Sequence, residues 1–165
     1  MKKFLSLLLA GIMIFSCMLA FSSCVARPEK DLDDARDNLE DEDYIVSYSD
    51  DSDQPGYEEY LYARNDKDDT LTVIIFSDTK LAGMYYDEMK AQIQYEKETI
   101  KREIKALEHM LKKYDDDMDS DEVDEMEDEI KDLKKELKEY DEIVIGKSGK
   151  TVWMGTKDAI KDSKG

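Results

Sequence analysis

The sequence has very little cysteine, histidine and proline. Of its 165 residues, two are cysteine, two are proline and one is histidine. Cys17 and Cys24 lie in the first 24 residues, so the rest of the chain has no thiol for disulfides, metal ligation or catalysis. His109 alone cannot form a histidine-rich metal site. Because no paired-acid or nucleophile motif stands out either, we predict a non-catalytic protein without catalytic residues, cofactor or metal site.

Basic residues are also outnumbered. The chain has 24 Lys and Arg against 42 Asp and Glu, a formal net charge of −18. Residues 1–23 contain Lys2, Lys3 and no acid, so the chain without them carries −20. Such a surface repels nucleic acid and anionic lipid. We therefore predict no nucleic-acid partner and favour cationic, neutral or metal-bridged partners, although the charge also serves solubility.

The N-terminal residues follow the order of a secretory signal. A basic Lys2-Lys3 pair precedes an apolar run over residues 4–21, which ends in small residues before Cys24. The motif Phe21-Ser22-Ser23-Cys24 resembles the lipobox of bacterial lipoprotein precursors. This resemblance, which is limited to the N-terminus, implies cleavage before Cys24 and lipid attachment to it. It also implies an extracytoplasmic protein held on the outer face of the cell membrane by its lipid anchor.

Two alternatives to attachment at Cys24 remain. The motif Ile14-Phe15-Ser16-Cys17 puts bulky Phe15 where a small residue is expected, and it leaves apolar residues 18–21 on the mature chain. We therefore favour Cys24 over Cys17. An uncleaved anchor helix is the second alternative, because residues 4–26 are nearly long enough for the roughly 20 apolar residues that span a bilayer. It places the rest of the chain on the same side of the membrane.

After a signal peptide at 1–23 and a lipidated N-terminus and tether at 24–28, we predict a single α+β domain over 29–165. Leu32, Ala35 and Leu39 have helical spacing and predict a short helix over about 29–41. Strands are expected at 44–48, 60–63, 71–76, 143–145 and 151–154, mainly antiparallel, with Thr156 capping a final short helix. The apolar strand 71–76 should be central and covered on both faces.

The segment between the third and fourth strands predicts a helical hairpin. No proline or glycine occurs over residues 84–145. One apolar stripe of helical spacing ends before an acidic break at 115–120, and a second stripe begins after it. We expect Ser77 or Asp78 to cap the first helix, whose Leu81–Met89 part packs on the sheet. The second stripe, Val123 to Tyr140, is a heptad seam. We favour an antiparallel coiled-coil insertion at about 90–140 over one helix of about 90 Å. It would be a protein-partner surface or a spacer.

Other motifs fit ordinary structure better than a site. GKSGKT at 146–151 has Val144 where a phosphate loop needs its first glycine, which favours a hairpin turn. A calcium loop that starts at Asp115 would have Ser120 and Met126 where it needs glycine and a bidentate acid, so we favour a solvated tip there, and we interpret the acidic loop of Asp50, Asp51 and Asp53 in the same way. We expect Asp119 to cap the second helix, His109 to be on the surface and Trp153 in the core.

Five tyrosines provide the remaining candidate surface: Tyr57, Tyr60, Tyr62, Tyr85 and Tyr86. Aromatic side chains can form a binding surface, but strand tyrosines more often pack against their cross-strand neighbours. The alternative to a protein-interaction module is therefore a domain for a small ligand or divalent cation, bound at these tyrosines or at the acidic loops. A carboxylate-based hydrolase ranks below both.

Overall fold

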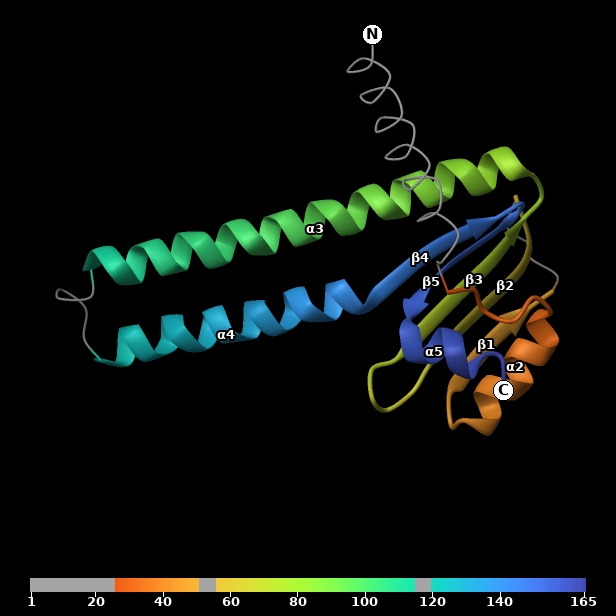
Figure 1. Cartoon of the computed structure of the whole chain (residues 1–165), viewed down its shortest axis with the longest axis horizontal. Helices are drawn as coiled ribbons and strands as arrows, with labels where there is room; N and C mark the ends of the chain where they lie inside the picture. The colour runs from red at the N-terminus through yellow and green to blue at the C-terminus, as the bar shows by residue number, and fades with distance from the viewer. Residues whose placement is uncertain (1–25, 51–55, 115–119) are drawn as a thin grey trace, which may run out of the picture.

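The computed structural model describes residues 26–50, 56–114 and 120–165 and confirms an α+β fold (Figure 1). Five strands form one sheet in the order β1-β2-β3-β5-β4, and every neighbouring pair is antiparallel. The elements are α2 (Leu32–Asp41), β1 (Ile45–Ser49), β2 (Tyr57–Arg64), β3 (Thr70–Phe76), α3 (Thr79–Tyr114), α4 (Ser120–Glu142), β4 (Ile143–Ser148), β5 (Thr151–Thr156) and α5 (Lys157–Asp162).

Strand β3 is the central strand, and both of its faces are covered as predicted. Leu71 and Val73 belong to a core cluster that also contains residues of α2 and α5. Ile74 and Phe76 belong to a second cluster that contains Ala82 of α3. The run of apolar residues therefore reflects burial on both sides of the sheet.

Helices α2 and α5 cover the first face. Leu32, Ala35 and Leu39 are buried at the predicted spacing, and Trp153 is buried among them. The caps follow from short polar side chains, whose oxygens accept from backbone N–H groups that a first turn leaves unpaired. Asp31 caps α2, and the Thr156 hydroxyl caps α5 by accepting from the N–H of Ala159, as predicted.

The start of α3 covers the second face. Of the two predicted caps, Asp78 is the one used, because its Oδ1 accepts from the N–H groups of Lys80 at 2.7 Å and Leu81 at 2.9 Å. Ala82 is fully buried, and Tyr85 packs against the same cluster. Leu81 does not behave as predicted: 37% of it is exposed, so the buried stripe starts one residue later.

Helices α3 and α4 run antiparallel and project beyond the sheet (Figure 1). Lys97 pairs with Asp141, whereas Glu108, further along α3, pairs with Lys134, nearer the start of α4. The predicted break is confirmed, since α3 ends at Tyr114 and α4 begins at Ser120. One continuous helix is therefore excluded. The finer coiled-coil geometry stays a prediction, and Asp119, the predicted cap, lies outside the described residues.

Two strand boundaries differ from the prediction. Strand β2 begins at Tyr57 because Tyr57 and Glu59 pair with Phe76 and Ile75 of β3, with an irregularity between them. Strand β4 continues to Ser148, which pairs with Thr151 and leaves only Gly149 and Lys150 in the turn.

Candidate functional site

The first described residues are attached to the domain. The indole Nε1 of Trp153 donates to the carbonyl oxygen of Ala26 at 2.9 Å. The N–H of Glu29 donates to the hydroxyl of Ser163 at 3.2 Å, and Ser163 is fully buried. Most of the predicted tether, from Ala26 on, is therefore part of the folded body. Cys24 lies outside the described residues, so its lipidation stays a prediction.

A cavity of about 370 Å³ opens beside this N-terminal segment. One wall contains Arg27 and Lys30, and the opposite wall contains Ser148, Thr151 and the indole of Trp153. Two cationic residues, two hydroxyl-bearing residues and an indole thus line the same cavity. A small anion is the chemical group that suits such walls, because cations and hydroxyls both donate hydrogen bonds.

A larger cavity, of about 480 Å³, lies where the hairpin joins the body. It is bounded by the β2–β3 turn, the last turns of α4 and Thr156 of β5. Both walls carry both signs of charge: Lys67, Asp68 and Asp69 on the turn, and Lys135, Lys138, Glu139 and Glu142 on α4.

The turn wall of this larger cavity is held in place by its own hydrogen bonds. The side-chain oxygen of Asn65 accepts from the N–H groups of Lys67 and Asp69, both at 3.0 Å. Its amide group donates to the Asp69 carboxylate at 3.3 Å. On α4 the charges form loose pairs, with Lys135 and Glu139 separated by 3.5 Å. A small molecule with both a positive and a negative group could be accommodated there.

This larger cavity was missed by sequence reasoning. Residues 67–70 and 135–143 are far apart in the chain, and they meet because β3 and β4 both pair with β5. No local motif signals such a juxtaposition.

Four of the five predicted tyrosines gather, and they do so by packing. Tyr57, Tyr60, Tyr85 and Tyr86 lie against the second core cluster. The ring centroids of Tyr57 and Phe76 are 5.1 Å apart in an edge-to-face arrangement. Burial raises the pKa of Tyr60 and Tyr85. Tyr62 is partly buried and is not part of this cluster. The packing interpretation therefore fits these side chains better than a binding surface.

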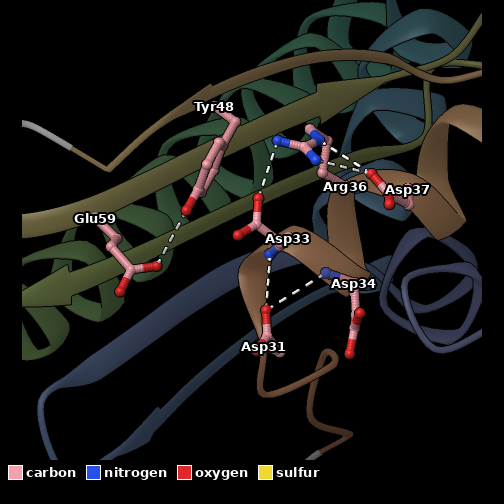
Figure 2. A network of polar contacts seen from close by, with 7 residues as sticks. All are labelled: Asp31, Asp33, Asp34, Arg36, Asp37, Tyr48 and Glu59. Atoms are coloured by element: carbon pink, nitrogen blue, oxygen red, sulfur yellow. Dashed lines mark hydrogen bonds and ion pairs between the residues drawn. The ribbon is translucent and has the colours of Figure 1, made fainter.

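A polar network joins α2 to the sheet without forming a site (Figure 2). The guanidinium of Arg36 pairs with Asp33 at 3.0 Å and with Asp37 at 2.9 Å. It also lies 5.3 Å from the centre of the Tyr48 ring on β1. The hydrogen bond that Arg36 donates to the Asp37 carboxylate is the largest influence that raises the pKa of Arg36. The charges are satisfied by one another, so the network orients α2 rather than awaiting a ligand.

The remaining predicted motifs lie on ordinary secondary structure or outside the described residues. Residues 51–55 and 115–119 of the acidic segments lie outside them. Elsewhere no group of three or more His, Cys, Asp or Glu is placed to hold a metal ion. Residues 146–151 are strand and turn, and His109 is exposed on α3. No helix of the described part has the length and apolarity needed to cross a membrane.

The outer surface of the hairpin is strongly charged and uneven. Helix α4 has twelve acidic residues and four basic ones, and residues 121–129 have seven acidic and no basic residues. These nine residues are at the end of the hairpin farthest from the sheet (Figure 1). The tip of the hairpin, defined as residues 121–129, is therefore an acidic surface.

Comparison with known proteins adds no assignment. No family model, no curated protein and no solved structure matches the chain. The residues and their arrangement are therefore the basis for the function proposed below.

Proposed function

We propose that the chain is the precursor of a membrane-anchored extracytoplasmic lipoprotein whose mature part is a non-catalytic module for binding a protein partner. The basic, apolar and small-residue order of residues 1–23, followed by Cys24, supports the anchor. The projecting helices α3 and α4 support the binding role. The hairpin is the surface that meets the partner.

The observation that carries the binding role is how the hairpin buries its apolar residues. Helix α3 has 36 residues, or about 54 Å at 1.5 Å per residue, and α4 covers its projecting part. Ile100, Ile104 and Ile130 are buried between the two helices. The two helices thus bury each other's apolar stripes, so a partner is not needed for folding. The outer face of each helix remains available for binding a partner. About a third of the chain forms this projection without contributing to the core of the sheet.

Charge indicates the kind of partner. The acidic tip favours a cationic protein surface, because complementary potentials accelerate encounter and disfavour wrong partners. Much of this attraction is exposed to solvent, so it weakens as salt shortens the Debye length. We therefore expect a partner with a basic patch, bound more weakly at high ionic strength.

A photo-crosslinking experiment on cells tests the binding role. A photo-crosslinking amino acid is introduced at position 127, on the tip, and, in a separate protein, at position 157 on α5 as the comparison site. We expect an adduct from position 127 that is reduced by Glu125→Lys with Glu129→Lys. The matched control, Glu40→Lys with Asp41→Lys on α2, changes the charge equally and should leave the adduct intact. Identical adducts from both positions would contradict a role for the hairpin.

The intact mass of the membrane-extracted protein tests the anchor separately. Cleavage before Cys24 with at least two acyl chains is expected, since one chain binds a membrane only marginally. A Cys24→Ser variant should lose the acyl mass and leave the membrane fraction. Unmodified Cys24 on a membrane-bound protein would favour the uncleaved anchor helix instead.

A second candidate function, binding of a small zwitterion, is favoured by the 480 Å³ cavity with both signs of charge. Thermal melting with free amino acids and dipeptides tests it. Lys138→Gln with Glu139→Gln, in the cavity wall, should abolish any shift. The control Lys131→Gln with Asp128→Asn removes a pair on the same helix that does not line this cavity. Calcium belongs in the same series, and no shift with any of these ligands would reject this candidate.

A further inference from the structure

The anchor residue is close to a fixed point of the domain. The carbonyl of Ala26 is hydrogen-bonded to Trp153 at 2.9 Å, and Trp153 is 3% exposed. Cys24 precedes Ala26 by two residues in the sequence, and two residues of chain extend at most about 7 Å. This is shorter than the Debye length of about 8 Å at physiological salt. Charges beside Ala26 are therefore within electrostatic range of the surface that holds an anchored Cys24.

The charges beside Ala26 are cationic, in contrast to the rest of the chain. Arg27 and Lys30 line the 370 Å³ cavity, whereas Lys147 of β4 pairs with Val152 and therefore lies on the other face of the sheet from Ser148 and Thr151. Lys150 pairs with Glu58 at 2.8 Å. Within the described residues the side chains of Arg27 and Lys30 form no ion pair, although acidic residues outnumber basic ones 42 to 24 in the sequence.

The cavity supplies hydroxyls as well as charge. Ser148 and Thr151 line it opposite the two cations, and Glu29 is the one acidic residue in its wall. The Glu29 carboxylate accepts from the N–H of Lys30 at 2.7 Å. A phosphate group matches this set, because it accepts several hydrogen bonds and carries negative charge. Juxtamembrane cations attract anionic lipid in the same way.

We propose that this N-terminal cationic surface, comprising Arg27, Lys30, Ser148 and Thr151, binds the anionic phospholipid headgroups of the membrane to which the protein is anchored. The inference rests on the anchor of the proposed function. It makes the start of the domain a docked contact with the bilayer rather than a flexible tether. The remaining acidic surface is repelled by the same headgroups, which orients the hairpin tip away from the membrane.

Trp153 is the only tryptophan of the chain and therefore a built-in reporter. The full-length membrane-extracted protein is reconstituted into vesicles that contain a lipid with a nitroxide on its headgroup. The bulk lipid is either anionic phosphatidylglycerol or zwitterionic phosphatidylcholine. Quenching of Trp153 then measures contact of this surface with the headgroups, while flotation and intact mass measure anchoring independently.

The expected result is quenching about two-fold stronger in phosphatidylglycerol than in phosphatidylcholine, because local cations add to the anchor's attraction. Arg27→Glu with Lys30→Glu should bring it to the phosphatidylcholine level, as should about 0.5 M salt. The matched control Lys105→Glu with Lys112→Glu, on exposed hairpin positions, should leave it unchanged. A Gly/Ser spacer of about eight residues after Val25 should weaken it, because flexible linkers lengthen the reach.

Each outcome supports or overturns the proposed headgroup surface. Equal quenching in both lipids, or none in a protein that floats with the vesicles, overturns the headgroup surface and leaves the proposed anchor standing. A protein that carries no anchor and does not float overturns both. Circular dichroism of the charge-reversed variants verifies that they fold, so a loss of quenching is not a loss of structure.

Discussion

The sheet body and the helical hairpin bury their apolar residues in different ways. The body has a core on each side of β3, and Leu61, Leu71 and Val73 have no exposed surface. The hairpin has one seam, in which Ile100, Ile104 and Ile130 retain 4–7% exposure and the other members are only partly buried. Stability scales with the apolar area that is buried. The body is therefore expected to set the global stability, and the hairpin to open separately.

Ion pairs do not compensate for the thinner seam. Glu108 and Lys134 bridge the two helices at 2.8 Å, but both side chains are at least half exposed. Such exposed pairs contribute about 0 to 1 kcal/mol. The hairpin must be stabilised chiefly by its leucine and isoleucine side chains, and a comparison of equal truncations in the two regions tests this.

The largest effect is expected from Leu61→Ala in the body. Leu61 is fully buried, so its truncation should lower the free energy of unfolding by about 3 to 5 kcal/mol through lost transfer energy and a residual cavity. Leu133→Ala, the same change in the partly buried seam, should cost about 1 to 2 kcal/mol, because less apolar surface is lost. Urea unfolding followed by Trp153 fluorescence and by helical circular dichroism measures both.

The two signals separate the two regions. Leu133→Ala should shift the helical transition while the Trp153 transition stays close to that of the wild type. Coincident transitions in every variant would show that body and hairpin unfold as one unit, which would end the distinction drawn between them.

A glycine pair sharpens the comparison with a smaller effect. A Cβ at Gly146 in β4 would lie 2.1 Å from the Trp153 ring, whereas a Cβ at Gly83 in α3 meets nothing within 4 Å. Gly146→Ala should destabilise by about 1 to 3 kcal/mol as an overpacked core site. Gly83→Ala should stabilise by about 0.5 to 1 kcal/mol, since alanine is the better helix former. Thermal melting should show opposite shifts, and two shifts of the same sign would contradict the packing of Trp153 on Gly146.

The comparison also shows what could be predicted from sequence. Helix α2, the long helices and the strands follow local spacing, and the caps Asp78 and Thr156 follow local chemistry. The start of β2 could not be predicted, because Tyr57 and Glu59 become strand through pairing with β3. The strand order depends on pairings between distant segments.

The candidate sites were less predictable than the fold. The cavity at the hairpin base needs the β2–β3 turn beside α4, and the N-terminal surface needs Trp153 bonded to Ala26. Both are contacts between residues more than 60 positions apart. Ser148 and Thr151 did stand out in the sequence as part of a phosphate-loop-like motif, but Arg27 and Lys30, which line the same cavity, did not.

Tyr44 gives the body a dependence on alkaline pH. Its hydroxyl donates to Asp162 at 3.0 Å, and burial, followed by this hydrogen bond, raises its pKa. An unfolded tyrosine ionises near pH 10, so the unfolded state loses its proton first and stability falls as pH rises above about 10. Tyr44→Phe should cost about 1 kcal/mol at neutral pH and make the alkaline decline shallower.

The measurement for Tyr44 is urea unfolding between about pH 8 and 11, in which the slope is compared between variants. Tyr95→Phe is the control, because 64% of Tyr95 is exposed on α3. An alkaline slope unchanged by Tyr44→Phe would show that other tyrosines whose pKa is raised, such as the partly buried Tyr60 and Tyr85, carry the effect.

The smallest effect is expected at the ion pair that ties the base of the hairpin together. The hydrogen bond from Lys97 is the main influence that lowers the pKa of Asp141. Because the folded state binds this proton less readily, the pair stabilises above the unfolded pKa of about 3.9 and is lost as pH falls through the lower folded pKa. Asp141→Asn should lower the hairpin melting temperature slightly at pH 7, less than Leu133→Ala does, and about 0.5 M salt should reduce the difference. Asp128→Asn, which removes an exposed pair within α4, should lower the melting temperature less still, since of these two pairs it is Lys97–Asp141 that joins two helices. A larger loss at Asp128 than at Asp141 would mean that helix propensity, rather than contact between the helices, limits the stability of the hairpin.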